Sequence, residues 1–121
     1  MDLTKQKCVP CEGGTKPMSE KEAMDYLKMT REWELVASRG IPLEPMSIQR
    51  KFIFKDFAEA LNFVNKVGRL ANAEDHHPDI FIHNYKKVDI TLSTHAIGGL
   101  SVNEMITAAK INQLHAGVVH R

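Results

Sequence analysis

The sequence predicts an α+β domain in which a four-stranded antiparallel sheet carries helices on one face. Two observations lead to this class. Helix and strand patterns follow one another in the order α-β-β-α-β-β-α, so the strands come in consecutive pairs that can form hairpins. The last strand pattern alternates between apolar and polar residues, which indicates one buried and one wet face. A parallel sheet would need strand–helix–strand alternation throughout, which this chain lacks.

Each predicted helix begins at a capping-box signature, a Ser or Asp followed three residues later by a Glu. The side chain of each of the two residues accepts a hydrogen bond from a free backbone N–H group at the start of the helix. The pairs are Ser19 with Glu22, Asp56 with Glu59, and Ser101 with Glu104. We expect the first helix to run to about Arg31 and the second to about Asn72. The third follows Gly98-Gly99, and its apolar stripe is Val102, Met105, Ile106 and Ala109.

The second helix has apolar residues at helical spacing, and we expect one face of it to be buried. That face is predicted to contain Phe57, Leu61, Val64, Gly68 and Ala71. A glycine on a buried face suggests that a neighbouring backbone approaches closely at Gly68.

The strands are predicted at residues 33–37, 48–54, 80–83 and 88–92. Gly40 and Pro42 interrupt the chain between the first two strands, and Tyr85 and Lys86 lie where the second pair turns.

The composition is that of one ordinary globular domain. The chain has 121 residues, of which 43% are hydrophobic and 26% charged. The formal net charge is +1 and the basic residues are scattered, so the sequence does not predict a basic surface for nucleic-acid binding. The apolar runs are too short to span a bilayer. We expect residues 1–18 to form an irregular leader and residues 19–121 the domain.

The start of the chain and its cysteines bear on location. Residues 1–10 are polar and lack the apolar core of a secretory signal. Two cysteines are too few for a disulfide framework, so we expect a reducing, cytoplasmic setting.

Two histidine motifs could carry chemistry. Asp75-His76-His77-Pro78-Asp79 lies between a helix end and a strand, and Ser93-Thr94-His95 lies where a strand runs into a loop. Histidine titrates near neutral pH, so it can give and accept a proton within one turnover. Pro78 pushes His77 toward extended geometry, and loops at element ends often present catalytic groups. The histidines could therefore converge on one site.

Other readings of these residues remain open. The adjacent histidines can form a polar turn and His95 can be a surface residue, and we expect purely structural roles for His83, His115 and His120. Adjacent histidines in an extended chain point to opposite sides, which makes them poor co-ligands of one metal ion. Cys8 and Cys11 could bind zinc or act as a redox pair, but no second Cys-x-x-Cys completes a four-ligand site.

Together the motifs resemble those of the pterin-4a-carbinolamine dehydratases, a small family also known for a dimerisation-cofactor role in transcription. The resemblance extends from about Ser19 to Leu114. It is carried by Asp75-His76-His77-Pro78, Tyr85, Thr91-Leu92-Ser93-Thr94-His95 and Gly99-Leu100-Ser101. It implies the same four-stranded fold and assembly into homodimers or homotetramers.

The resemblance implies dehydration of 4a-hydroxytetrahydrobiopterin to quinonoid dihydrobiopterin, in tetrahydrobiopterin recycling. The C4a hydroxyl leaves with a proton from an acid, and N5 loses its proton to a base. His76 and His95 would be the acid–base pair, in either order, and His77 would orient the pterin. The implied substrate-binding residues are Asp75, Pro78, Ser93, Thr94, Ala96, Ile97 and Glu104. Neither a metal nor a redox cofactor is required.

This chain departs from the family pattern at three of these positions. Glu104 stands where the family usually has Asp, so the charge is kept with a longer reach, and it also fits the capping box with Ser101. Ala96 and Ile97 replace more polar or sulfur-bearing residues of some relatives, which would alter the polarity of the pocket. The substrate stays open between biopterin, another pterin and a molybdopterin-type compound.

A second function is compatible with the same fold: a non-catalytic scaffold that stabilises another protein's oligomer. The expected partners are a pterin substrate and further copies of the chain, with a transcription factor or the aromatic amino acid hydroxylase system as a further protein partner. Neither direct nucleic-acid binding nor membrane attachment is expected.

Overall fold

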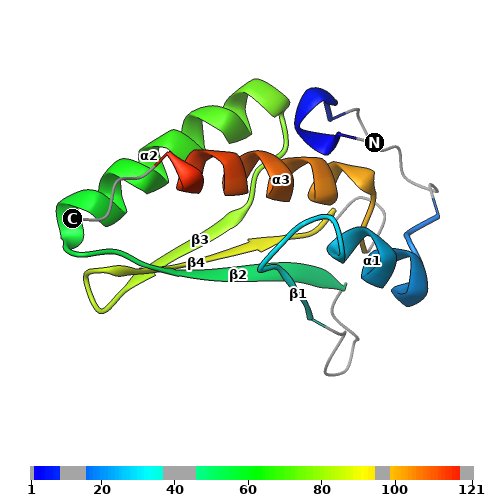
Figure 1. Cartoon of the computed structure of the whole chain (residues 1–121), viewed down its shortest axis with the longest axis horizontal. Helices are drawn as coiled ribbons and strands as arrows, with labels where there is room; N and C mark the ends of the chain where they lie inside the picture. Colours follow the sequence, from blue (N-terminus) through cyan, green and yellow to red (C-terminus); the bar gives the residue numbers. More distant parts are fainter. Residues whose placement is uncertain (1, 9–15, 37–45, 95–98, 118–121) are drawn as a thin grey trace.

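The computed structural model describes residues 2–8, 16–36, 46–94 and 99–117. The elements are η1 (Leu3–Lys5), α1 (Glu20–Leu27), β1 (Glu34–Val36), β2 (Ser47–Ile53), α2 (Phe57–Glu74), β3 (Asp79–His83), β4 (Lys87–Leu92) and α3 (Val102–Ala116). Figure 1 shows α2 and α3 lying along one face of the sheet. The predicted α+β class and element order are confirmed.

The sheet has the strand order β1-β2-β4-β3, and every neighbouring pair is antiparallel. Ile48 is opposite Leu92 and Phe52 is opposite Val88 across the central pair. Because side chains alternate between the two faces, these apolar residues all point toward the helices. Each is at most 3% exposed, so the core lies between the sheet and the α2–α3 layer.

The first helix ends earlier than predicted, at Leu27 rather than near Arg31. The amide of Met29 donates to the Tyr26 carbonyl at 2.9 Å, and the buried Thr30 hydroxyl donates to the same carbonyl at 3.3 Å. These bonds replace the helical pattern with a tighter turn. Glu32 then adopts a φ of 74°, and the chain reverses into β1.

The predicted buried face of α2 is correct only in part: Ala71 is buried and Val64 packs against the core, but Phe57 and Leu61 do not face it. Phe57 is 49% exposed and Leu61 is 40% exposed, whereas the residues facing the core are Ala60, Phe63, Val67 and Ala71. The helix has apolar residues on two adjacent stripes, and spacing alone does not say which one meets the sheet. The expectation of a close approach at Gly68 is also wrong: apart from its chain neighbours and the backbone of its own helix, no described residue has an atom within 4 Å of where its Cβ would be.

The predicted capping boxes at Ser19–Glu22 and Ser101–Glu104 are both present. At the start of α2 only half of the box forms. The Asp56 side chain accepts from the Glu59 amide at 2.8 Å, but the Glu59 carboxylate accepts from the Lys55 amide.

Residues 2–8 pack against α3 ahead of the first long helix. Leu3 in η1 is 4% exposed and belongs to the core. The Cys8 amide donates to Glu74 Oε2 at 2.9 Å, and Glu74 Oε1 pairs with Lys110 Nζ on α3. The Glu74 carboxylate thus joins the end of α2, the middle of α3 and the N-terminal segment. The boundary predicted at residue 18 stays a prediction.

The Glu74 side chain is only 6% exposed. Burial opposes its ionisation, but the hydrogen bonds from Lys110 and the Cys8 amide outweigh burial and lower the pKa of this carboxyl. A carboxyl whose pKa is lower in the folded state stabilises the fold above its unfolded pKa, and this stabilisation is lost as pH falls through the folded pKa.

Glu74→Gln is therefore expected to lower the free energy of unfolding near pH 7 by about 1.5–3 kcal/mol, the usual value of a hydrogen bond to a charged group. The difference from the native chain should be smaller at about pH 3, because this stabilisation declines below the ordinary pKa of the carboxyl and is lost as pH falls through its lower folded pKa. Urea unfolding at both pH values measures it. Asp25→Asn is the control, because Asp25 forms an exposed pair with Lys28 and should change the stability little. A Glu74→Gln effect independent of pH would contradict this account.

Candidate active site

The turn after α2 directs His76 into the protein. Asp75 takes the left-handed conformation, with φ 50° and ψ 42°, and ends the helix. The His76 amide then donates to the Ala71 carbonyl at 3.1 Å, which anchors the backbone at the histidine. The His76 side chain is 11% exposed, whereas Asp75 is on the surface.

Glu104, in the first turn of α3, is the carboxylate that His76 meets. It is fully buried, at 0% exposure. Its Oε1 atom accepts from the Ser101 amide at 2.7 Å, and its Oε2 atom accepts from the Thr94 hydroxyl at 2.7 Å. Glu104 therefore both caps α3 and forms part of the candidate site.

The two groups form a buried imidazole–carboxylate pair. His76 Nε2 lies 2.6 Å from Glu104 Oε2, but the atoms are not aligned as a regular hydrogen bond, and no other described residue offers Nε2 a hydrogen-bond partner. The two side chains are therefore in close polar contact without forming a regular hydrogen bond. The two atoms are close enough for proton exchange once the ring and the carboxyl group are aligned.

The other ring nitrogen of His76 faces α3 as well. Nδ1 lies 3.4 Å from the Thr107 hydroxyl, which donates to the Asn103 carbonyl at 2.9 Å. The imidazole is therefore held from both edges by residues of α3.

His77 points away from this pair. It is exposed, and its Nε2 atom lies 3.1 Å from Asn72 Oδ1 in the last turn of α2. The structure brings His76, Thr94 and Glu104 together, whereas His77 lies on the outside of the same turn.

The second histidine motif is described only in part. Ser93 and Thr94 are half-buried at the end of β4, and Pro78 is half-buried after the α2 turn. The backbones of Thr94 and Gly99 are hydrogen-bonded in both directions, at 2.8 and 3.2 Å. Thr94, the last described residue of this motif, contacts the Glu104 carboxyl group. His95, Ala96 and Ile97 lie outside the described residues.

Two of the other histidines have structural contacts. The His115 ring packs edge-on against Phe52 and Phe63, with centroid distances of 5.0 and 5.8 Å. His83 lies 3.1 Å from Asp89 and stacks on Phe81. His120 lies outside the described residues.

Sequence reasoning missed Thr107 and Asn72 as partners of the histidines, and Cys8 as a neighbour of Thr107. One signal could have identified Thr107: it follows Glu104 by one helical turn, so both polar side chains point to the same side of α3. The contact with Cys8 joins residues far apart in the chain, and no local pattern indicates it.

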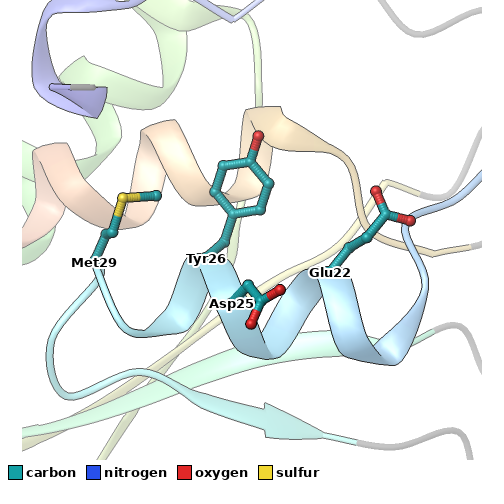
Figure 2. Close-up of a pocket in the computed structure, with 4 residues that line it drawn as sticks. All are labelled: Glu22, Asp25, Tyr26 and Met29. Atoms are coloured by element: carbon teal, nitrogen blue, oxygen red, sulfur yellow. The ribbon is translucent and has the colours of Figure 1, made fainter.

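Two pockets bounded by described residues lie away from His76, each of about 230 Å³. One is lined by Glu22, Asp25, Tyr26 and Met29, and Figure 2 shows all four coming from α1 and the turn after it. The other is lined by Arg31, Glu32, Arg50, Asn112, His115 and Ala116. Neither contains a residue of the predicted site.

The described part of the chain contains no group of three or more His, Cys, Asp or Glu side chains placed to hold a metal ion. The alternative zinc or redox role of Cys8 with Cys11 cannot be placed, because Cys11 lies outside that part. No helix among the described ranges is long and apolar enough to cross a membrane.

Comparison with known proteins gives a consistent family assignment. Residues 16–114 match the family model described as pterin 4 alpha carbinolamine dehydratase. A protein of Halorhodospira halophila with the provisional name pterin-4-alpha-carbinolamine dehydratase is 42% identical over 116 residues, covering 96% of this chain and 100% of the relative. The mitochondrial pterin-4-alpha-carbinolamine dehydratase 2 of Arabidopsis thaliana is 38% identical, with 93% of this chain covering 59% of that protein.

Solved structures show the same fold. The transcriptional coactivator/pterin dehydratase of Brucella melitensis superposes with a TM-score of 0.71 at 32% identity, over 82% of this chain and 98% of that one. A pterin dehydratase-like protein described as a RuBisCO assembly factor of the alpha-carboxysome has a TM-score of 0.56 at 24% identity, over 74% and 94%, which shows likeness of fold alone. Because residues 16–114, most of this chain, match the family model, this chain belongs to the pterin 4 alpha carbinolamine dehydratase family.

Proposed function

We propose that this chain catalyses the dehydration of 4a-hydroxytetrahydrobiopterin to quinonoid dihydrobiopterin, in the recycling of tetrahydrobiopterin and in the cytoplasm. The observation that carries the proposal is the buried pair of His76 and Glu104 beside Thr94, the residue before His95. In this proposal, His76 and Glu104 exchange the proton at the point where α2, β4 and α3 meet.

The reaction needs one proton given and one proton taken. The C4a–O bond breaks as an acid protonates the departing hydroxyl, and the C4a=N5 double bond forms as a base removes the N5 proton. Water leaves and no electrons are exchanged with an external carrier, so the chemistry itself calls for no redox cofactor. Two histidines that start in opposite protonation states suit this exchange.

His76 and His95 are the acid–base pair in this proposal, and His77 orients the pterin. The exposed position of His77 supports a role in contacting a ligand that arrives from solvent. Glu104 is the buried acidic side chain beside His76 and exchanges a proton with it in this proposal. Asp75, Pro78, Ser93, Thr94, Ala96 and Ile97 line the substrate site.

The second candidate is a scaffold that assembles with itself or with a protein partner. Apolar side chains on two surfaces favour self-association. Phe57 and Leu61 form an exposed stripe on α2, and Ile53 and Phe81, both more than 60% exposed, lie on the sheet face away from the helices. Two separate apolar surfaces are what a homotetramer built from dimers would use. Catalysis and assembly are compatible with each other.

His76→Ala is expected to slow the dehydration by about 10²- to 10⁴-fold, the usual contribution of a positioned proton transfer. Formation of quinonoid dihydropterin from enzymatically generated 4a-hydroxytetrahydrobiopterin measures the rate. His83→Gln is the matched control and should keep the native rate, because His83 lies on the sheet face away from the helices. Equal rates for the native chain and His76→Ala would exclude the proposed role and favour the scaffold.

Glu104→Gln keeps an acceptor for the Ser101 amide and removes the charge beside His76. We expect a loss of about 10- to 100-fold in kcat, corresponding to a charge-assisted contact of about 1.5–3 kcal/mol. Glu104→Asp keeps the charge with a shorter reach and should lose less. If both variants fold and Glu104→Gln turns over at the native rate, the carboxylate is only a helix cap.

Leu61→Glu is expected to reduce the molar mass in solution, because it places a charge in the exposed stripe of α2. Asn62→Glu introduces the same charge at the next exposed position and should leave the mass unchanged. Light scattering after gel filtration measures both. A native chain that is monomeric at micromolar concentration would rule out self-association through this stripe.

A further inference from the structure

The pocket beside Arg50, of about 230 Å³, is lined by two guanidinium groups, those of Arg31 and Arg50. Arg31 is exposed, whereas Arg50 is partly buried, with its Cζ atom 4.5 Å from the centre of the Phe52 ring. Asn112 on the wall of this pocket lies eight residues beyond Glu104 on α3, which is about 12 Å along the helix. The pocket is therefore separate from the candidate active site.

Arg50 is held by groups that carry no negative charge. Its Nη1 atom donates to Asn112 Oδ1 at 2.6 Å, and its Nη2 atom lies 3.3 Å from His115 Nδ1. No carboxylate of the described ranges lies within 4 Å of the Arg50 nitrogens. A guanidinium has five N–H groups, and these two contacts occupy only part of them. Arg50 thus keeps donors and a positive charge for a ligand.

Asn112 fixes the Arg50 guanidinium without neutralising it. The Asn112 Oδ1 atom also accepts from Trp33 Nε1 at 2.8 Å, and the Nδ2 atom donates to the Arg31 carbonyl at 2.9 Å. Because the side chains of tryptophan and arginine only donate, the amide oxygen must face both of them. An aspartate at this position would accept the same two bonds and also pair with the Arg50 charge. The asparagine therefore holds Arg50 in place and leaves its charge available.

The partly buried charge of Arg50 is costly. Removal from water lowers the pKa of this guanidinium, and Arg31 acts in the same direction whereas Glu32 opposes it. Glu32 also lines the pocket, but its side chain is exposed, so water screens its attraction for Arg50. A charge removed from water is normally compensated by an opposite charge close to it. A bound anion would supply that charge here.

We propose that this pocket binds a phosphate group, either as the free ion or as the monoester of a small molecule. Guanidinium groups donate paired N–H···O bonds to phosphate oxygens, and two of them in one pocket favour a dianion over a singly charged carboxylate. Trp33 and Asn112 hold Arg50 before the ligand arrives, which lowers the cost of ordering the site. This binding role is independent of the proposed dehydration.

Trp33 is the only tryptophan of the chain, so its indole N–H gives one NMR signal, which reports on Asn112 and, through it, on Arg50. The native chain is titrated with inorganic phosphate and separately with methyl phosphate, at an ionic strength held constant with sodium chloride. We expect a saturable shift with half-saturation at about 1 mM, an ordinary affinity for a small ion held by a few charge-assisted hydrogen bonds. Tighter binding of methyl phosphate would support a monoester as the ligand, and tighter binding of inorganic phosphate would support the free ion.

Asn112→Asp keeps the acceptor for Trp33 and places a carboxylate beside Arg50. It should weaken phosphate binding by about 10-fold or more, because the anion would meet a neutralised guanidinium. Gln113→Asp is the matched control: it adds the same charge at the next, exposed residue of α3 and should weaken binding by about 2-fold at most. Thermal unfolding verifies that both variants fold.

Arg31→Gln tests the same site without a change in the interior, because Arg31 is exposed. It should weaken phosphate binding by about 3- to 10-fold through the loss of one charge-assisted contact. A shift of the indole signal that does not saturate, an equal shift with sodium chloride alone, or an equal loss of affinity in Asn112→Asp and Gln113→Asp would each overturn the proposal. Native affinity in Arg31→Gln together with native affinity in folded Asn112→Asp would overturn it as well.

Discussion

The buried carboxylate of Glu104 is the constraint on which the candidate site depends. A charge removed from water is costly unless hydrogen bonds and an opposite charge compensate for it. The Ser101 amide and the Thr94 hydroxyl donate hydrogen bonds to this carboxylate, and the His76 imidazole lies 2.6 Å from it, so side chains and backbone from three parts of the chain meet there. The start of α3, the end of β4 and the turn after α2 are therefore held together by one side chain. The same contacts that hold this junction together also place His76 beside Glu104, the pair to which the proposed function assigns the proton exchange.

The two adjacent histidines lie in different surroundings. The left-handed residue Asp75 ends α2 and turns the chain, so His76 enters the interior while His77 stays outside. One imidazole is thereby shielded from water and fixed by α3, where a proton can be held in a defined place. The other is free to meet a ligand from solvent. A single backbone turn thus places one imidazole in the interior and its sequence neighbour on the surface, and in the proposed mechanism the first exchanges protons and the second contacts the pterin.

The fold could be predicted from local patterns, because strand alternation and helix caps are encoded by neighbouring residues. The sheet, its hairpins and the cap at Ser101 follow from such patterns. The buried face of α2 followed only in part, since two apolar stripes compete and only packing against the sheet selects between them. The pairing of His76 with Glu104 was also hidden, because the carboxylate was equally well explained as a cap. The contact of Thr107 with Cys8 depends on the docking of a distant segment, which no spacing in the sequence encodes.

The most direct test of the account is a crystal structure of the chain with 7,8-dihydrobiopterin bound. The account predicts that the pterin ring lies against the His76 side of the α2 turn, in contact with His77 and with the loop that follows Thr94, while the Glu104 contact to His76 is kept. A ring bound in the pocket lined by Tyr26 and Met29, or in the pocket beside Arg50, with no contact to His76, would contradict the central claim.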